Sequence, residues 1–267
     1  MNSPETKPMI PVALTIAGSD PSGGAGIQAD LKTFHQFGVY GMSVLTLLTV
    51  QNTSSVDAVK HLGADFVLAQ LDALLEDIPP QAAKTGALGT REIIEALAEK
   101  AGQFSFPLVV DPVMISKHGA PLLEEEAQSA LRHKLLPRAY LVTPNIHEAM
   151  ALAAMEYRDS SSLKQAAEAI ADLGPQAVLI KGGHLSEEAT DLLYTGGQFH
   201  SFAARRIETR HTHGTGCTYS AAITAGLAKG ADLFQAVATA KQYITRAIET
   251  NPGLGHGFGP VNHFASF

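Results

Sequence analysis

The chain has 267 residues, 45% of them hydrophobic, and carries 19 basic against 26 acidic residues for a net charge of −7. This length suits one domain, residues 1–267, with a single large core. The acidic balance argues against nucleic acid as a partner, and no apolar run reaches the roughly eighteen residues that a membrane helix needs. We therefore expect small molecules as partners.

The cysteine content and the first residues indicate a compartment. Cys217 is the only cysteine, which excludes an internal disulfide framework. The opening stretch MNSPETKPMIP has neither the basic nor the apolar region of a signal peptide. A cytoplasmic protein is the expectation.

Apolar runs alternate with segments of helical spacing along the chain. The predicted strands are residues 12–18, 43–51, 82–88, 107–113, 139–145 and 177–183. The predicted helices between them are residues 27–38, 65–78, 90–102, 124–136 and 146–155. Apolar strands separated by amphipathic helices favour a mostly parallel sheet with helices on both faces.

A TIM barrel would show the same alternation. Residues 191–208 instead predict a hairpin with a Gly-Gly turn, and two helices, residues 217–230 and 232–250, then follow one another. We therefore predict an α/β fold of three layers, with an open, mostly parallel sheet in the middle. The glycine-rich tail, residues 251–264, is expected to cover the surface.

Polar residues follow several of these strands, at the edge where an open α/β sheet binds ligands. They are Asp20, Gln51, Asp111, Asn145, Glu148 and Lys181. Such residues are common in strand-to-helix loops whatever the function. Because five separate loops coincide, a ligand site is the better interpretation. Asp20 itself would either accept hydrogen bonds from a substrate or cap the following helix.

The stretch HGTGC, residues 213–217, is a more specific signal. Gly214, Thr215 and Gly216 at a helix start expose N–H groups that, with the helix dipole, suit a transferring phosphoryl group. Cys217 would then take a proton from a substrate hydroxyl or act as a nucleophile, or it would simply pack the helix. A helix start lowers the pKa of a thiol and burial raises it, so its resting protonation is open.

Two further motifs each have two interpretations. Asn145 and Glu148 in TPNIHEA would face one point and suit Mg²⁺ through oxygen ligands, or they would form a capping box at a helix start. Lys181 ends an apolar strand, where its ammonium group would meet either a nucleotide phosphate or the carboxylate of Asp111.

Taken together, GSDPSGGAGIQADLKTF, TVQN, KTG, DPVM, VTPNIHEA, VLIKGGH, THGTGCTYSAAI and GPVNHF resemble, from end to end, the hydroxymethylpyrimidine/phosphomethylpyrimidine kinases of thiamin biosynthesis. That family has the ribokinase-like fold, whose usual GxGD motif reads GTGC here. The resemblance implies an enzyme that uses ATP and Mg²⁺ to phosphorylate 4-amino-5-hydroxymethyl-2-methylpyrimidine and then its monophosphate. Members commonly form homodimers.

The resemblance also implies residue roles. The catalytic group would be Cys217 as general base with Gly214, Thr215 and Gly216 as the phosphoryl-binding turn. The substrate contacts would be Gln51, which reads the aminopyrimidine ring, Asp20, Gly18 and Val113. The ATP contacts would be Lys181, Asn145, Thr143 and His213. Glu148 and Asp111, beside Asn145, would organise Mg²⁺.

Two departures from the family pattern stand out, the first bearing on the substrate pocket and the second on the cations beside the phosphates. Ala87 stands where many members have a Met that packs on the pyrimidine, and His256 stands where a related enzyme would have a Lys. The nearest alternative function is a pyridoxal or pyridoxine kinase of the same fold, which would also use Cys217 as base and Gln51 beside a pyridine ring. A non-catalytic binding protein and a thiol hydrolase with Cys217 as nucleophile are alternatives from other classes.

Overall fold

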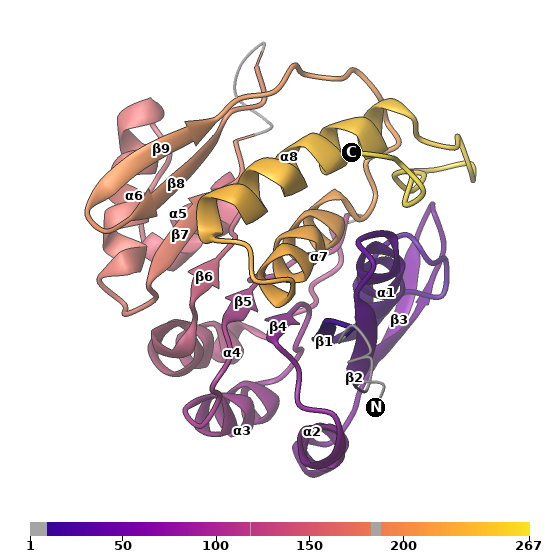
Figure 1. The fold of residues 1–267 in the computed structure, drawn as a ribbon, viewed down its shortest axis with the longest axis vertical. Helices are drawn as coiled ribbons and strands as arrows, with labels where there is room; N and C mark the ends of the chain where they lie inside the picture. The colour runs from indigo at the N-terminus through magenta and orange to yellow at the C-terminus, as the bar shows by residue number, and fades with distance from the viewer. Residues whose placement is uncertain (1–9, 118, 183–187) are drawn as a thin grey trace, which may run out of the picture.

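A computed structural model describes residues 10–117, 119–182 and 188–267 (Figure 1). Its sheet has nine strands in the order β3-β2-β1-β4-β5-β6-β7-β8-β9. Their bounds are β1 (Val12–Ser19), β2 (Tyr40–Gln51), β3 (Val56–His61), β4 (Ala82–Thr85), β5 (Leu108–Val110), β6 (Leu141–Val142), β7 (Ala177–Ile180), β8 (Asp191–Thr195) and β9 (Gln198–Phe202). Six neighbouring strands pair in parallel, in the order β2-β1-β4-β5-β6-β7, whereas β3, β8 and β9 pair antiparallel with their neighbours.

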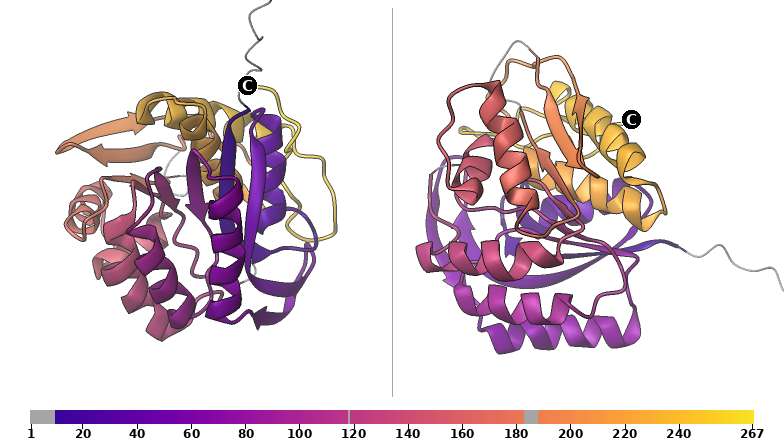
Figure 2. Two further views of the ribbon diagram at one scale, coloured as in Figure 1. Left: turned by 60° about the horizontal axis from the view of Figure 1, so that its bottom comes forward. Right: turned by 90° about the vertical axis from the view of Figure 1, so that its left-hand side faces the viewer.

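Helices cover both faces of this sheet (Figures 1 and 2). Their bounds are α1 (Gly26–Gln36), α2 (Ala64–Asp77), α3 (Arg91–Ala101), α4 (Glu125–Ala130), α5 (Ile146–Ala153), α6 (Ser160–Ala171), α7 (Thr215–Ala228) and α8 (Leu233–Glu249). Residues that alternate along one strand enter two separate cores. In β5, Leu108 and Val110 pack with α3 and α5, while Val109 packs with α7 and α8. This confirms the predicted three-layer α/β sheet.

The predicted hairpin is present between β8 and β9. Gly196 and Gly197 connect the two strands with φ angles of 57° and 76°, a backbone conformation that favours glycine at both turn positions. Two helices then follow in succession, α7 and α8, as expected.

Two elements escaped the sequence analysis. Strand β3 reads VDAVKH, and its side chains are exposed or half-buried, so it lacks an apolar run. Helix α6 begins with three serines after Asp159, whose side chain accepts hydrogen bonds from the N–H groups of Ser161 and Ser162. Capping rather than an apolar stripe marks its start.

The helix predicted over residues 124–136 is shorter than expected. Helix α4 passes into a π-helical turn, Leu131–Leu135, and then a 3₁₀ turn, Leu136–Arg138. Pro137 lies in that last turn and has no N–H group to continue an α-helical ladder.

The parallel strands end at one edge, where the residues at or just after the ends of β1, β2, β5 and β6, and Lys181 after β7, gather near the start of α7. The C-terminal segment reaches this edge as well: the N–H of Phe258 donates to the Thr53 carbonyl at 2.7 Å. Within the ranges that the structure describes, no helix combines the length and the apolar character that crossing a bilayer requires.

Candidate active site

The turn between β1 and α1 is built around Asp20. Its buried carboxylate accepts hydrogen bonds from the N–H and hydroxyl of Ser22 at 2.9 and 2.7 Å, and from the N–H groups of Gly24 and Ala25 at 3.2 and 2.8 Å. Burial raises the pKa of Asp20, but the hydrogen bonds from His213 and Ser22 outweigh it and the pKa is lowered. Asp20 therefore organises the turn as a carboxylate, while Ala25 occupies the N-cap of α1.

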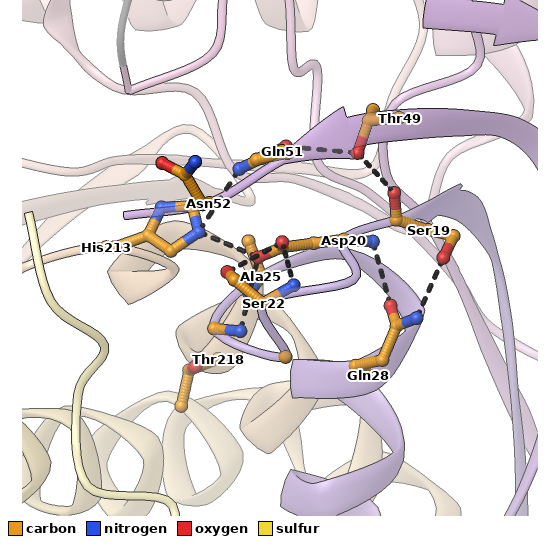
Figure 3. Close-up of polar contacts among 12 residues, drawn as sticks. Ser19, Asp20, Ser22, Ala25, Gln28, Thr49, Gln51, Asn52, His213 and Thr218 are labelled. Carbon is orange, nitrogen blue, oxygen red and sulfur yellow. Dashed lines mark hydrogen bonds and ion pairs between the residues drawn. The ribbon is translucent and has the colours of Figure 1, made fainter. Parts of the chain in front are cut away.

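Asp20 also joins this turn to His213 and Gln51 (Figure 3). Nε2 of His213 lies 2.7 Å from Asp20 Oδ2 and 3.3 Å from the side-chain nitrogen of Gln51, which ends β2. His213 is only 3% exposed. These contacts place His213 beside two of the predicted substrate contacts, whereas the resemblance assigns it to ATP.

The first turn of α7 contains Cys217. Gly214, the N-cap, has a φ of 76°, and a Cβ there would collide with the carbonyl oxygen of Gly24. A glycine is therefore required where these two segments meet. Burial raises the pKa of the Cys217 thiol to about 12, although the Lys84 ammonium and the N–H of Gly26 favour the thiolate. Cys217 is thus a neutral thiol at pH 7 in this structure.

A buried ion pair that sequence reasoning missed lies close enough to Cys217 to affect its charge. Lys84 in β4 donates to Asp30 of α1 at 2.8 Å, and Thr15 of β1 donates to the other oxygen of Asp30 at 2.6 Å. Both charged side chains are fully buried. The available signal was a lysine inside the strand AAKT, whose four residues are all buried.

Asp111, at the end of β5, is the centre of a second polar group. Its carboxylate accepts hydrogen bonds from Lys181 at 2.9 Å, from Thr143 at 3.2 Å and from Ser220 at 3.2 Å. Burial raises the pKa of Asp111, but the charges of Lys181 and Lys84 more than offset this and lower it. The sequence left two partners open for the Lys181 ammonium group, a nucleotide phosphate or the carboxylate of Asp111. In this structure the partner is Asp111. Ser220 is a member of this group that was not predicted from the sequence.

The first turn of α7 joins the two polar groups. A Cβ on Gly216 would lie 3.3 Å from Nζ of Lys181, and Gly214 contacts the turn that Asp20 organises. The missing side chain at Gly216 leaves space at a helix N-terminus beside an ammonium group. Thr215 stabilises the turn by donating to the Thr212 carbonyl at 2.8 Å. This arrangement can hold an anion between N–H groups and a cation.

Asn145 and Glu148 form both bonds of a capping box at the start of α5. The Asn145 side chain accepts from the Glu148 N–H at 2.9 Å, and Glu148 accepts from the Asn145 N–H at 2.8 Å. Burial and the charge of Asp111 raise the pKa of Glu148 to about 7 against the opposing effect of Lys181. Among the described residues, no group of three or more His, Cys, Asp or Glu side chains could hold a metal ion by itself.

The remaining predicted positions lie around these groups. Gly18 is packed so closely that a Cβ would lie 2.5 Å from a methyl group of Leu47. Val113 lines a small cavity with Thr85, Gly86 and Asp111. Ala87 lies at the same edge, and its carbonyl accepts a hydrogen bond from Thr46 at 2.6 Å.

Comparisons with known proteins cover nearly the whole chain. Residues 20–262 match the family model described as phosphomethylpyrimidine kinase. The hydroxymethylpyrimidine/phosphomethylpyrimidine kinase of Bacillus subtilis (strain 168) is 47% identical over 256 residues, which cover 95% of this chain and 94% of the relative.

Two solved structures extend the comparison to the fold. An ADP complex of Bacillus subtilis pyridoxal kinase has a TM-score of 0.90 and 42% identity, and the match covers 96% of this chain and 98% of that one. The phosphomethylpyrimidine kinase of Clostridium difficile 630 has a TM-score of 0.79 and 46% identity, over 89% and 99% of the two chains.

Proposed function

Because this chain belongs to the phosphomethylpyrimidine kinase family, we propose that it phosphorylates 4-amino-5-hydroxymethyl-2-methylpyrimidine and then the monophosphate, with ATP as donor, in thiamin biosynthesis. As a member of that family the chain is a kinase. The observation that carries the proposal is 47% identity over almost the full length of both chains to a kinase of this name. The anion-binding turn beside Lys181 is the physical feature that supports it.

ATP would bind with its terminal phosphates at the start of α7. The N–H groups of Gly214 and Gly216 lie at a helix N-terminus, where helical partners are lacking, whereas the Thr215 N–H donates to the Thr212 carbonyl at 3.3 Å. Lys181 supplies a positive charge next to Gly216. Such donors stabilise the negative charge that spreads over a phosphoryl group during transfer. Thr143 and Asn145 act indirectly at this phosphate site. Thr143 donates a hydrogen bond to Asp111, and Asn145 caps the start of α5.

Mg²⁺ fits this site through water and phosphate rather than through a full set of protein ligands. The oxygens of Asp111 and Glu148 already accept hydrogen bonds, and Mg²⁺ commonly keeps several waters beside one or two carboxylates. A dication near both would favour the ionised form of Glu148, whose pKa the Asp111 charge helps to raise. Bound Mg²⁺ would neutralise charge on the phosphates.

Cys217 is the general base of the proposed reaction. The substrate hydroxyl oxygen forms a bond to the terminal phosphorus of ATP, the bond from that phosphorus to the bridging oxygen breaks, ADP leaves, and the hydroxyl proton passes to sulfur. A thiol with a pKa of about 12 already carries its proton at pH 7 and cannot accept another, so Cys217 must first release that proton to solvent, as the substrates bind, and then react as the thiolate. Neutralisation of Asp111 favours it, because the Asp111 charge opposes the thiolate and the Lys84 charge supports it.

A pyridoxal or pyridoxine kinase is the second candidate. The observation that favours it is the TM-score of 0.90 to Bacillus subtilis pyridoxal kinase. The resemblance implies a Met at the position of Ala87 in many members, and the smaller alanine side chain would leave room for a different ring. The rival substrates separate the two candidates.

The test is an assay of the purified chain with MgATP and, separately, the hydroxymethylpyrimidine, its monophosphate, pyridoxal and pyridoxine. Both pyrimidines should be phosphorylated, and Cys217→Ala should lower kcat by about two to four decades, as expected when a general base is removed. Turnover of the vitamin B6 compounds alone would favour the second candidate. Absence of ATP consumption with every compound would reject a kinase.

The resemblance supports two expectations about the molecule in the cell. We infer a homodimer in the cytoplasm, with ATP and the pyrimidine as its small-molecule partners. Sedimentation of the purified chain at several concentrations tests the first expectation, since a monomer at all of them would contradict it.

A further inference from the structure

Gln51 ends β2 with its side-chain amide between His213 and Thr49 (Figure 3). One end of the amide lies 3.3 Å from Nε2 of His213, and the other end lies 3.3 Å from Oγ1 of Thr49. A rotation of 180° about the last side-chain bond exchanges oxygen and nitrogen at nearly the same positions. The partners at the two ends therefore decide which atom faces which neighbour.

At the first end, Asp20 determines the proton on His213. A carboxylate only accepts hydrogen bonds, and Asp20 is ionised because its lowered pKa lies below neutrality. His213 Nε2, at 2.7 Å from Asp20 Oδ2, must therefore carry a hydrogen. The Gln51 atom that faces this N–H is then required to be an acceptor.

At the second end, Thr49 imposes the same choice independently. A threonine hydroxyl has one proton, and Thr49 donates it to the carbonyl oxygen of Ser19 at 2.9 Å. Towards Gln51 the hydroxyl oxygen can only accept. The Gln51 atom that faces Thr49 is thus required to be the NH₂ nitrogen.

We propose that Asp20 and His213 are positioning residues that hold the Gln51 amide with its carbonyl oxygen towards His213 and its NH₂ group towards Thr49. In the reverse orientation, which Figure 3 draws, two N–H groups face each other and two oxygens face each other whenever these protons are in place. The amide therefore presents its donor and its acceptor to a ring in one fixed order. The resemblance implies an ATP contact for His213 and a substrate contact for Asp20, whereas this proposal gives both residues a positioning role.

The fixed order selects a class of substrate, a step that rests on the proposed function. A 4-aminopyrimidine presents an N–H donor beside an acceptor ring nitrogen. Its 4-oxo analogue, as the lactam, presents an acceptor beside a donor N–H. An amide that is free to rotate would pair with either ring, whereas a held amide pairs with one and leaves two mismatched contacts with the other.

The experiment compares kcat/KM for 4-amino-5-hydroxymethyl-2-methylpyrimidine and for its 4-oxo analogue. In the double variant His213→Leu/Thr49→Val the ratio of the two values should fall by at least about tenfold, because neither end of the amide then has a partner that holds its orientation. Each single variant should lower the ratio by less. Ser22, Gly24 and Ala25 still donate to Asp20 in these variants, so the turn retains its support. A lower rate with an unchanged ratio would overturn the inference.

Gln28→Leu is the matched control. Gln28 accepts from the Asp20 N–H at 2.9 Å and donates to the Ser19 hydroxyl at 2.8 Å, so this variant disturbs the same turn without contacting the amide. Its ratio should equal that of the wild type. Should the double variant fail to fold, His213→Leu and Thr49→Val taken singly decide the question through a smaller fall in the same ratio, because each removes one of the two partners that hold the amide.

A neutron diffraction map of the deuterated wild-type protein provides a readout that is independent of turnover. Deuterium on Nε2 of His213 and an ND₂ group facing Thr49 are the expected result, and an ND₂ group facing His213 would overturn the inference. A wild type that ignores both pyrimidines would reject the proposed function, while the map would still decide the orientation of Gln51.

Discussion

Glu148 shows how one buried residue couples the site to stability. Its carboxyl group accepts the Asn145 N–H at the start of α5 and is also repelled by the Asp111 carboxylate. The folded protein therefore keeps a proton on Glu148 over a pH range in which the unfolded chain has released it. A group whose pKa is raised on folding contributes stability below its unfolded pKa and loses that contribution as the pH rises through its folded value.

The expected consequence is a fall in the free energy of unfolding of about 3 kcal/mol as the pH rises from 4.5 to 7, the unfolded and folded pKa values of Glu148. Glu148→Gln has no titrating group at this position, yet its side-chain oxygen can still accept the Asn145 N–H. Urea unfolding of both proteins across this range isolates the effect as a difference. Equal slopes with pH in the two proteins would contradict it.

At the scale of an element, the first turn of α7 combines two demands on its glycines. Gly214 needs a left-handed backbone and the absence of a Cβ, whereas Gly216 lies inside the helix and only its missing Cβ matters. A methyl group at Gly216 would enter the space beside Lys181 without disturbing the helix, where alanine is preferred over glycine by roughly 1 kcal/mol. A substitution at Gly216 can therefore weaken phosphate binding without lowering the stability of the fold.

Gly216→Ala should lose at least about a decade in kcat/KM for ATP, because one well-placed contact in a phosphoryl-binding turn contributes that much or more. Its melting temperature should stay close to that of the wild type. Gly226→Ala in the same helix is the control: its Cβ would lie 3.1 Å from Ala236 of α8, so it should lower the melting temperature and leave kcat/KM of the folded protein unchanged. The opposite pattern in this pair of variants would contradict the assignment.

At the scale of the molecule, one continuous sheet links both cores. Strand β1 contributes Leu14 and Ile16 to the core beneath α2 and α3, and Ala13 to the core beneath α7 and α8. Neither core can lose its helices without exposing one face of strands that the other core needs. The prediction of a single domain over residues 1–267 therefore implies that the two cores unfold together, in one cooperative transition.

Unfolding in urea should be a single transition for every probe. The chain has no tryptophan, so a tryptophan introduced at Leu97 in α3 and, in a second variant, at Phe234 in α8 would report on the two faces separately. The two fluorescence midpoints should coincide with that of far-UV circular dichroism. Two separated midpoints would show that the faces unfold as independent units.

The sequence by itself determined most of the sheet and of its covering helices, the Gly-Gly hairpin and the edge at which the polar residues gather, because periodicity and turn chemistry are local. Strand β3 and helix α6 were not predicted. The sequence also did not determine how the polar residues pair. His213 contacts Asp20 across 193 positions of the chain, and Lys84 contacts Asp30 across 54. Only the folded chain decides which donor reaches which acceptor and how much water each keeps. The protonation of Cys217 depends on its burial and on the charges near it, and the orientation of Gln51 depends on its hydrogen-bond partners. Both are therefore decided only by the tertiary structure.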